Sequence, residues 1–142
     1  MNRFIAYINT RRPEAVEHAI GLLGWFEEMG NICHFAPESA VAIGRPDLTI
    51  EETDITSDFK LAISLGGDGS VLRTVTAVSG HEIPVLGINF GRIGYLSGVE
   101  PNLSRQRISQ FLEGDFYLEK RMRLKIESPI GVAYTHLTLP TK

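Results

Sequence analysis

The chain has 142 residues, a hydrophobic content of 43% and a formal net charge of −3, which fits one ordinary domain with a buried core. The slight negative charge excludes a general attraction to nucleic acid or anionic membranes, and no run approaches the roughly 18 apolar residues of a membrane span. The sequence enters a strand-like segment without a signal peptide, and its single cysteine, Cys33, excludes an internal disulfide. We therefore expect a globular, cytoplasmic protein.

The first segment has the pattern of a strand followed by a helix. Residues 3–8 are aromatic and β-branched enough to predict a strand. Asn9 and Thr10 offer capping oxygens ahead of Pro13, which suits the first turn of a helix, and Gly30 provides a stop signal. The apolar residues that recur at helical spacing, and that we expect to be buried, are Val16, Ala19, Ile20, Leu23 and Phe26.

Two conspicuous side chains of this helix receive plain structural interpretations. His18 is interpreted as a solvated helix residue, and Trp25 as a residue that packs against the sheet. Beyond the helix, residues 31–36 and 40–43 are short strand candidates.

Residues 44–58 form a polar and acidic stretch. Its carboxylates lack the convergent spacing of a metal cluster and lie in a loop-like context, which favours a solvated connection. The acids concerned are Glu51, Glu52, Asp54 and Asp58.

The next stretch joins a buried strand to a glycine-rich turn. Residues 61–65 form a short apolar run, Gly66, Gly67 and Gly69 follow at once, and a helix can open from Val71. This arrangement presents backbone N–H groups and the positive end of a helix dipole to an anion, for which phosphate is the obvious candidate. The turn is no P-loop, because it lacks the required lysine, and it matches only the first two glycines of the dinucleotide fingerprint.

Asp68 lies at the tip of this turn. A carboxylate beside phosphate is repelled at close range, so a chemical role is needed to explain it there. It could hold a divalent metal, or accept the proton of a hydroxyl that attacks phosphorus. The simpler alternative is a turn or capping residue. We favour the functional interpretation, because glycines bracket Asp68 directly after a buried strand. Arg73 could face the same anion or be an exposed surface arginine.

The second half continues the alternation of strands and helices. Residues 83–88 predict a strand that ends at Asn89, and residues 103–112 predict a helix. Gly91 leaves the intervening turn without a side chain at this position, so that a ligand or another backbone can approach closely. Tyr95 could stack on a purine, although tyrosine is more often a core residue. The order predicts an α/β fold, a parallel sheet flanked by helices, with ligands at the carboxyl ends of the strands.

Two motifs resemble those of a known family. Residues 66–70, G-G-D-G-S, resemble the G-G-D-G-T motif of NAD kinases, diacylglycerol and sphingosine kinases and phosphofructokinases, and Ser70 keeps the hydroxyl. About 20 residues later, residues 85–96, V-L-G-I-N-F-G-R-I-G-Y-L, resemble the NAD kinase pattern G-[IV]-N-x-G-x-L-G-F-L. This stretch departs from the pattern at Ile93 and Tyr95, both mild changes. The pair of motifs, in this order, is specific to NAD kinases.

The resemblance implies a Rossmann-like N-terminal domain of the NAD kinase, diacylglycerol kinase and phosphofructokinase type. It implies ATP-dependent phosphorylation of the adenosine 2′-hydroxyl of NAD⁺ to give NADP⁺, with Mg²⁺ or another divalent cation, and Asp68 as the catalytic base. The residues it places at the nucleotide site, besides Asp68, are Gly66, Gly67, Gly69, Ser70, Arg73, Asn89, Gly91 and Tyr95. The complete protein is expected to be a homo-oligomer without nucleic-acid or membrane partners.

The resemblance covers roughly residues 1–128. Residues 1–115 are expected to form the α/β nucleotide-binding domain, residues 116–128 a strand that leads into a C-terminal β domain, and residues 129–142 an atypical tail. That β domain holds much of the dinucleotide site in NAD kinases and is expected to be missing here, so we expect this chain alone to be inactive. Two alternatives stay open: a lipid kinase of the diacylglycerol or sphingosine type, which the second motif disfavours, and a non-catalytic nucleotide-binding fragment.

Overall fold

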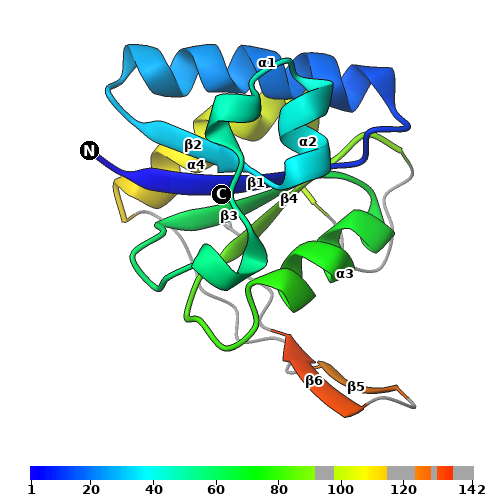
Figure 1. Ribbon diagram of the computed structural model, residues 1–142. Coiled ribbons are helices and arrows are strands. Elements are labelled where there is room, and N and C mark those ends of the chain that lie inside the picture. The colour runs from blue at the N-terminus through cyan, green and yellow to red at the C-terminus, as the bar shows by residue number, and fades with distance from the viewer. Residues whose placement is uncertain (92–97, 115–123, 129–130, 136–142) are drawn as a thin grey trace.

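The computed structural model describes residues 1–91, 98–114, 124–128 and 131–135, the last two ranges as backbone only. Four parallel strands form a sheet in the order β2-β1-β3-β4 (Figure 1). The strands are β1 (Arg3–Ile8), β2 (Ile32–Phe35), β3 (Leu61–Gly66) and β4 (Val85–Asn89). The helices are α1 (Pro13–Glu28), α2 (Pro37–Ala42), α3 (Asp68–Ala77) and α4 (Ser104–Leu112). The predicted α/β fold with a parallel, helix-flanked sheet is therefore confirmed.

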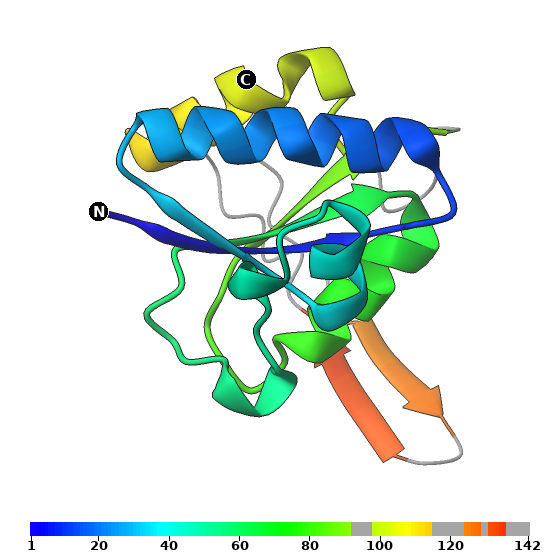
Figure 2. The ribbon, with the colours of Figure 1, turned by 45° about the horizontal axis from the view of Figure 1, so that its top comes forward.

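Helices cover both faces of the sheet, α1 and α4 on one and α3 on the other (Figures 1 and 2). Successive strand residues point to opposite faces, so Phe4 and Ala6 of β1 join the cluster under α1, while Ile5 joins the cluster under α3. The rings of Phe4 and Phe26 stack with centroids 4.4 Å apart. Burial on both faces explains why β3 is apolar throughout, apart from Ser64.

Several predicted elements agree closely with the structure. The first strand has the predicted bounds, and Gly30, with a φ of 76°, follows the end of α1. A left-handed residue just past a helix is the usual place for glycine. Gly114, with a φ of 80°, stands in the same relation to α4.

The face that α1 buries differs from the prediction. Ala15 and Leu22 are buried beside Ala19, Leu23 and Phe26, whereas the side chain of Ile20 is 50% exposed. Nor do the Asn9 or Thr10 oxygens cap this helix: Arg12 occupies the cap position without a side-chain hydrogen bond.

The strand predicted at residues 40–43 is wrong, because these residues belong to α2 and its end. Pro37 occupies the first turn, where its fixed φ suits a helix, and Glu38 adds a favourable negative charge at the N-terminus. The prediction considered only the four apolar residues 40–43 and therefore missed the helix-start signals that precede them, Pro37 and Glu38.

Strands β5 (Leu124–Ser128) and β6 (Gly131–Thr135) pair in antiparallel orientation, with Leu124 opposite Thr135. Part of the strand predicted over residues 116–128 is thus present, and residues 116–123 lie outside the described part. Residues 131–135, expected to be part of an atypical tail, pair with it as a strand. In the part of the chain that the structure describes, no helix has the length and apolar character needed to cross a membrane.

Candidate functional site at the carboxyl edge of the sheet

The two glycine-containing turns lie side by side where β3 and β4 end. Gly66 is the register partner of Asn89. The Phe90 N–H donates to the Gly66 carbonyl oxygen with an N···O distance of 2.9 Å, and the Asn9 N–H donates to the Leu65 carbonyl oxygen at 2.8 Å. Three strand ends are thus tied together at one edge, the place where parallel sheets bind ligands.

The helix after the first turn begins earlier than predicted, at Asp68 rather than Val71. Gly67 is its cap residue, and the Val71 N–H donates to the Gly67 carbonyl oxygen at 3.1 Å. Asp68, Gly69 and Ser70 therefore form the first turn of α3, whose N–H groups have no partner within the helix. This turn presents the positive end of the helix to the carboxyl edge.

The three glycines of the first turn have different physical roles. A Cβ on Gly66 would lie 2.9 Å from the Ser70 Cβ and 3.0 Å from the Asn9 Cβ, so packing within the protein requires glycine there. A Cβ on Gly67 or Gly69 would meet no atom within 4 Å. The open space that a ligand needs is therefore beside Gly67 and Gly69, not beside Gly66.

Ser70 is buried in this turn, and its carbonyl accepts a hydrogen bond from the Thr74 hydroxyl at 2.8 Å. The half-buried Asp68 stands in the first turn of α3. Within the described ranges, no group of three or more His, Cys, Asp or Glu residues could by itself hold a metal ion. The acids of residues 51–58 are exposed, as expected for a solvated connection.

The second turn is built by Asn89 and by an unpredicted residue, Arg12. The Asn89 Oδ1 accepts from the Gly91 N–H at 2.9 Å, and Arg12 Nη1 donates to the Phe90 carbonyl oxygen at 3.0 Å. A Cβ on Gly91 would lie 2.8 Å from Arg12 Nη2. The Arg12 guanidinium fills the space beside Gly91, and the approach of a ligand or another backbone at Gly91 stays a prediction.

Arg12 lies 78 residues from its partner Phe90, so no local pattern joins the two. The only signal in the sequence is its place, just after the first strand and before Pro13. Tyr95, predicted to contact adenine, lies outside the described residues.

Arg73 is exposed and lines a hollow of about 540 Å³ beside α3. We call this the α3 hollow; its lining residues are Tyr7, Ala36, Pro37, Glu38, Glu52, Leu72, Arg73, Thr76 and Ala77. Asp68 and the glycines of the first turn are not among them. The structure therefore places Arg73 near the carboxyl ends of β1 and β2, in a hollow that the first turn does not line.

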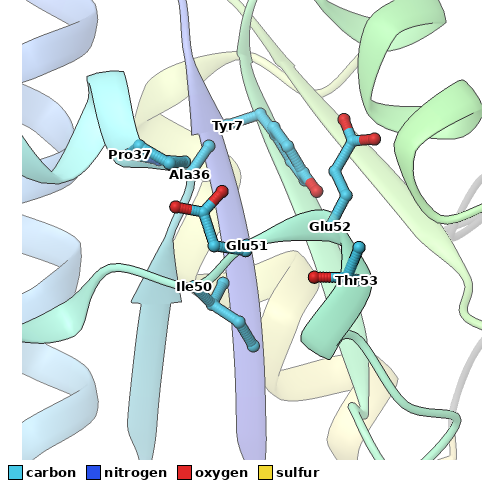
Figure 3. A pocket seen from close by; sticks show the side chains of 7 residues that line it. All are labelled: Tyr7, Ala36, Pro37, Ile50, Glu51, Glu52 and Thr53. Atoms are coloured by element: carbon cyan, nitrogen blue, oxygen red, sulfur yellow. The ribbon is translucent and has the colours of Figure 1, made fainter.

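A smaller hollow of about 270 Å³ shares four lining residues with the α3 hollow: Tyr7, Ala36, Pro37 and Glu52. Figure 3 shows the Tyr7 ring extending from β1 toward the segment that carries Glu52 and Thr53. Burial raises the pKa of the Tyr7 hydroxyl, and the negative charge of Glu52 raises it further. Tyr7 therefore stays protonated even in alkaline solution.

His18 is half-buried and contacts the second turn, so the prediction of a solvated residue is wrong. Its ring meets the Phe90 ring edge-on, with centroids 5.5 Å apart, and its Nε2 lies 2.8 Å from the Ser104 hydroxyl. Since that hydroxyl donates to the Pro101 carbonyl, His18 Nε2–H is the donor to Ser104. Trp25, also half-buried, packs against the core cluster under α1, as predicted.

Comparison with known proteins agrees with this geometry. Residues 8–116 match the family model of the ATP-NAD kinase N-terminal domain. An NAD kinase of Symbiobacterium thermophilum is 34% identical over 125 residues, covering 88% of this chain and 44% of the relative. An NAD kinase of Syntrophobacter fumaroxidans is 33% identical over 125 residues, covering 87% and 44%.

A solved structure shares the fold. The crystal structure of yeast NADH kinase complexed with NADH superposes with a TM-score of 0.70 at 20% identity, over 82% of this chain and 37% of that one. This chain thus spans less than half the length of these proteins. The match over residues 8–116 shows that the chain belongs to the ATP-NAD kinase N-terminal domain family.

Proposed function

We propose that this chain supplies the α/β part of an NAD kinase, which transfers the γ-phosphoryl group of ATP to the adenosine 2′-hydroxyl of NAD⁺. The observation that carries the proposal is the hydrogen bond from the Phe90 N–H to the Gly66 carbonyl, which holds the two motif turns together at the carboxyl edge. The names of the relatives favour this acceptor over a lipid.

Asp68 is the group that would accept the proton of the 2′-hydroxyl as its oxygen attacks the γ-phosphorus, while ADP departs with the electrons of the broken P–O bond. The open space at Gly67 and Gly69 supports this role, because phosphate oxygens can approach the N–H groups of the first turn of α3 there. Ser70 would add its own backbone N–H to this set.

A divalent cation fits this site only as a partner of the substrate phosphates. Mg²⁺ is commonly held by one or two carboxylates together with nucleotide phosphates and water. Asp68 offers one carboxylate, and the described residues contain no group of three or more His, Cys, Asp or Glu side chains that could hold a metal ion. We therefore propose that Mg²⁺ arrives with ATP, where it would neutralise charge on the transferred group.

The α3 hollow is large enough for a nucleoside, and Arg73 on its wall would add positive charge for a nucleotide phosphate. Asn89, Gly91 and Tyr95 are proposed to line the dinucleotide pocket. We also propose a cytoplasmic location and a homo-oligomeric complete protein.

The experiment measures NADP⁺ formation from ATP and NAD⁺ by this chain, and by a chimera that joins residues 1–128 to the C-terminal part of a relative named above. We expect NADP⁺ from the chimera and loss of it in the Asp68→Asn chimera. A folded chimera that binds neither nucleotide would contradict the proposal. Binding of both nucleotides without turnover would instead favour a non-catalytic nucleotide-binding domain.

A further inference from the structure

Arg12 crosses the carboxyl edge of the sheet from β1 to β4. Its backbone N–H donates to the Asn9 carbonyl oxygen at 3.0 Å, directly after β1, while its guanidinium bonds the Phe90 carbonyl directly after β4. Because β3 lies between these strands, the side chain reaches past the end of β3, where the first turn begins. Arg12 therefore bonds directly to the ends of β1 and β4, and these two ends are themselves hydrogen-bonded to the end of β3.

In the part of the chain that the structure describes, the guanidinium of Arg12 forms no ion pair with a carboxylate. Among the described residues, Arg3 pairs with Asp58, and Arg45 with Glu27 and Asp47, but no ion pair involves Arg12. Its side chain is nevertheless half-buried. A guanidinium carries five N–H donors in a fixed planar arrangement. The Phe90 carbonyl oxygen accepts a hydrogen bond from Nη1 alone, so it does not use all five donors.

Gly91 leaves room for the guanidinium. With any Cβ at position 91, Arg12 Nη2 would be 2.8 Å away and would have to move. The Asn89 side chain holds the Gly91 N–H at 2.9 Å, so the turn itself is fixed while the guanidinium occupies the space beside it. The turn is thus shaped to keep a positive charge at the ligand-binding edge.

We propose that Arg12 binds the diphosphate group of a nucleotide at this edge, through the N–H donors that the Phe90 carbonyl does not use. Planar N–H pairs match phosphate oxygens, and such charge-assisted hydrogen bonds are about twice as strong as neutral ones. The bond to Phe90 orients the guanidinium before the ligand arrives. This inference deepens the proposed function, because it adds a binding residue that neither motif contains.

The test titrates inorganic pyrophosphate into the 142-residue chain by calorimetry at low salt. Losing a charge-assisted contact should weaken binding about 10- to 100-fold in Arg12→Gln, with part of the affinity kept in Arg12→Lys. The matched control is Arg11→Gln, which removes the same charge from an exposed neighbour and should bind as the unchanged chain does. Parallel titrations with ADP and NAD⁺ show which nucleotide supplies the diphosphate.

Gly91→Ala is the second variant and keeps every charge. Its Cβ displaces the guanidinium, so we expect weaker pyrophosphate binding with a normal thermal unfolding profile, and little further loss when Arg12→Gln is added. If Arg12→Gln does not fold, the pyrophosphate affinity of Gly91→Ala alone tests the proposal. Hydrogen exchange of the Phe90 N–H reports the position of the turn separately from the binding of the anion.

The proposal is overturned if the unchanged chain does not bind pyrophosphate, or if Arg12→Gln and Gly91→Ala bind it normally. If Arg12→Gln exchanged the Phe90 N–H faster but bound pyrophosphate with unchanged affinity, Arg12 would have only a structural role. Arg12-dependent pyrophosphate binding in a protein whose chimera makes no NADP⁺ would support this inference while it contradicts the kinase proposal. The two failures are therefore distinguishable.

Discussion

Gly66 and Ser70 pack so closely that a Cβ on Gly66 would lie 2.9 Å from the Ser70 Cβ. This contact joins the end of β3 to the first turn of α3, and it fixes the direction in which the helix leaves the sheet. The conformation of the turn is thus maintained by packing between its first and last residues, while its middle residues remain open to a ligand.

Gly66→Ala should destabilise the protein by about 1–3 kcal/mol, the usual cost of overpacking a filled core. Gly69→Ala is the matched control. Its Cβ meets nothing within 4 Å, and alanine is a better helix former by about 1 kcal/mol, so stability should be kept or raised. Urea unfolding measures both, and equal destabilisation by the two changes would contradict this account of the turn.

Gly69→Ala should also weaken nucleotide binding although it does not unfold the protein. The new methyl group occupies space through which phosphate oxygens would reach the N–H groups of the first turn. Calorimetric titration of ATP measures this effect. Unchanged affinity in Gly69→Ala would show that phosphate does not approach the turn from this side.

Asp68→Asn keeps the shape of the side chain but cannot accept a proton at neutral pH. In the chimera described above, the turnover number should fall by roughly 10²–10⁴, with only a modest change in the KM for NAD⁺. Steady-state NADP⁺ formation measures both constants. Near-normal turnover would make Asp68 a structural residue of the first helical turn instead of the base.

Arg73→Gln should weaken nucleotide binding by about threefold to tenfold, since an exposed arginine makes a screened contact worth roughly 1 kcal/mol. The effect should shrink as salt is added. Lys60→Gln is the control, because Lys60 is also exposed but precedes β3 at the opposite, amino edge of the sheet. If both variants bind alike, the charge of Arg73 acts at long range and not in the α3 hollow.

The stability of the fold should decrease in mild acid. Burial, and secondarily the positive charge of Arg105, lowers the pKa of His18 below its usual 6.5. The unfolded chain then takes up this proton at higher pH than the folded protein, so the free energy of unfolding falls as the pH drops below about 6.5, until the lowered pKa is passed.

His18→Gln should reduce this dependence while its amide still donates to Ser104. Burial, followed by the charge of Arg3, lowers the pKa of His34 in the same way, so His34→Gln should also reduce the dependence, and the double variant should reduce it most. Urea unfolding between about pH 5 and 8 provides the comparison. A full pH dependence in the double variant would show that other groups cause it.

The local parts of the fold were predictable from the sequence, because each depends on residues that are neighbours in the chain. The bounds of β1, the end of α1 shortly before Gly30 and the strand that reaches Gly66 all follow from spacing and from special backbone conformations. The two motifs likewise indicated a shared site, since parallel strands end at one edge.

The remainder depends on contacts between distant residues. Arg12 meets Phe90 across 78 positions and His18 meets Ser104 across 86, and no periodicity encodes such pairs. The start of α3 at Asp68, earlier than predicted, also depends on packing. Asp68 and Gly69 have weak helix propensity, but Ser70 is buried, and this burial favours a helical first turn. Tertiary packing decided where local preference was weak.

The position of β1 between β2 and β3 has a consequence for the order in which the chain folds. Phe4 pairs with Cys33 on one side and with Leu61 on the other. During synthesis, β1, α1 and β2 can associate once residue 35 has left the ribosome, but the second edge of β1 stays unpaired until residues 61–66 follow. Unpaired strand edges are templates for wrong pairing. The arrival of β3 therefore both protects the nascent protein and builds the turn that carries Asp68.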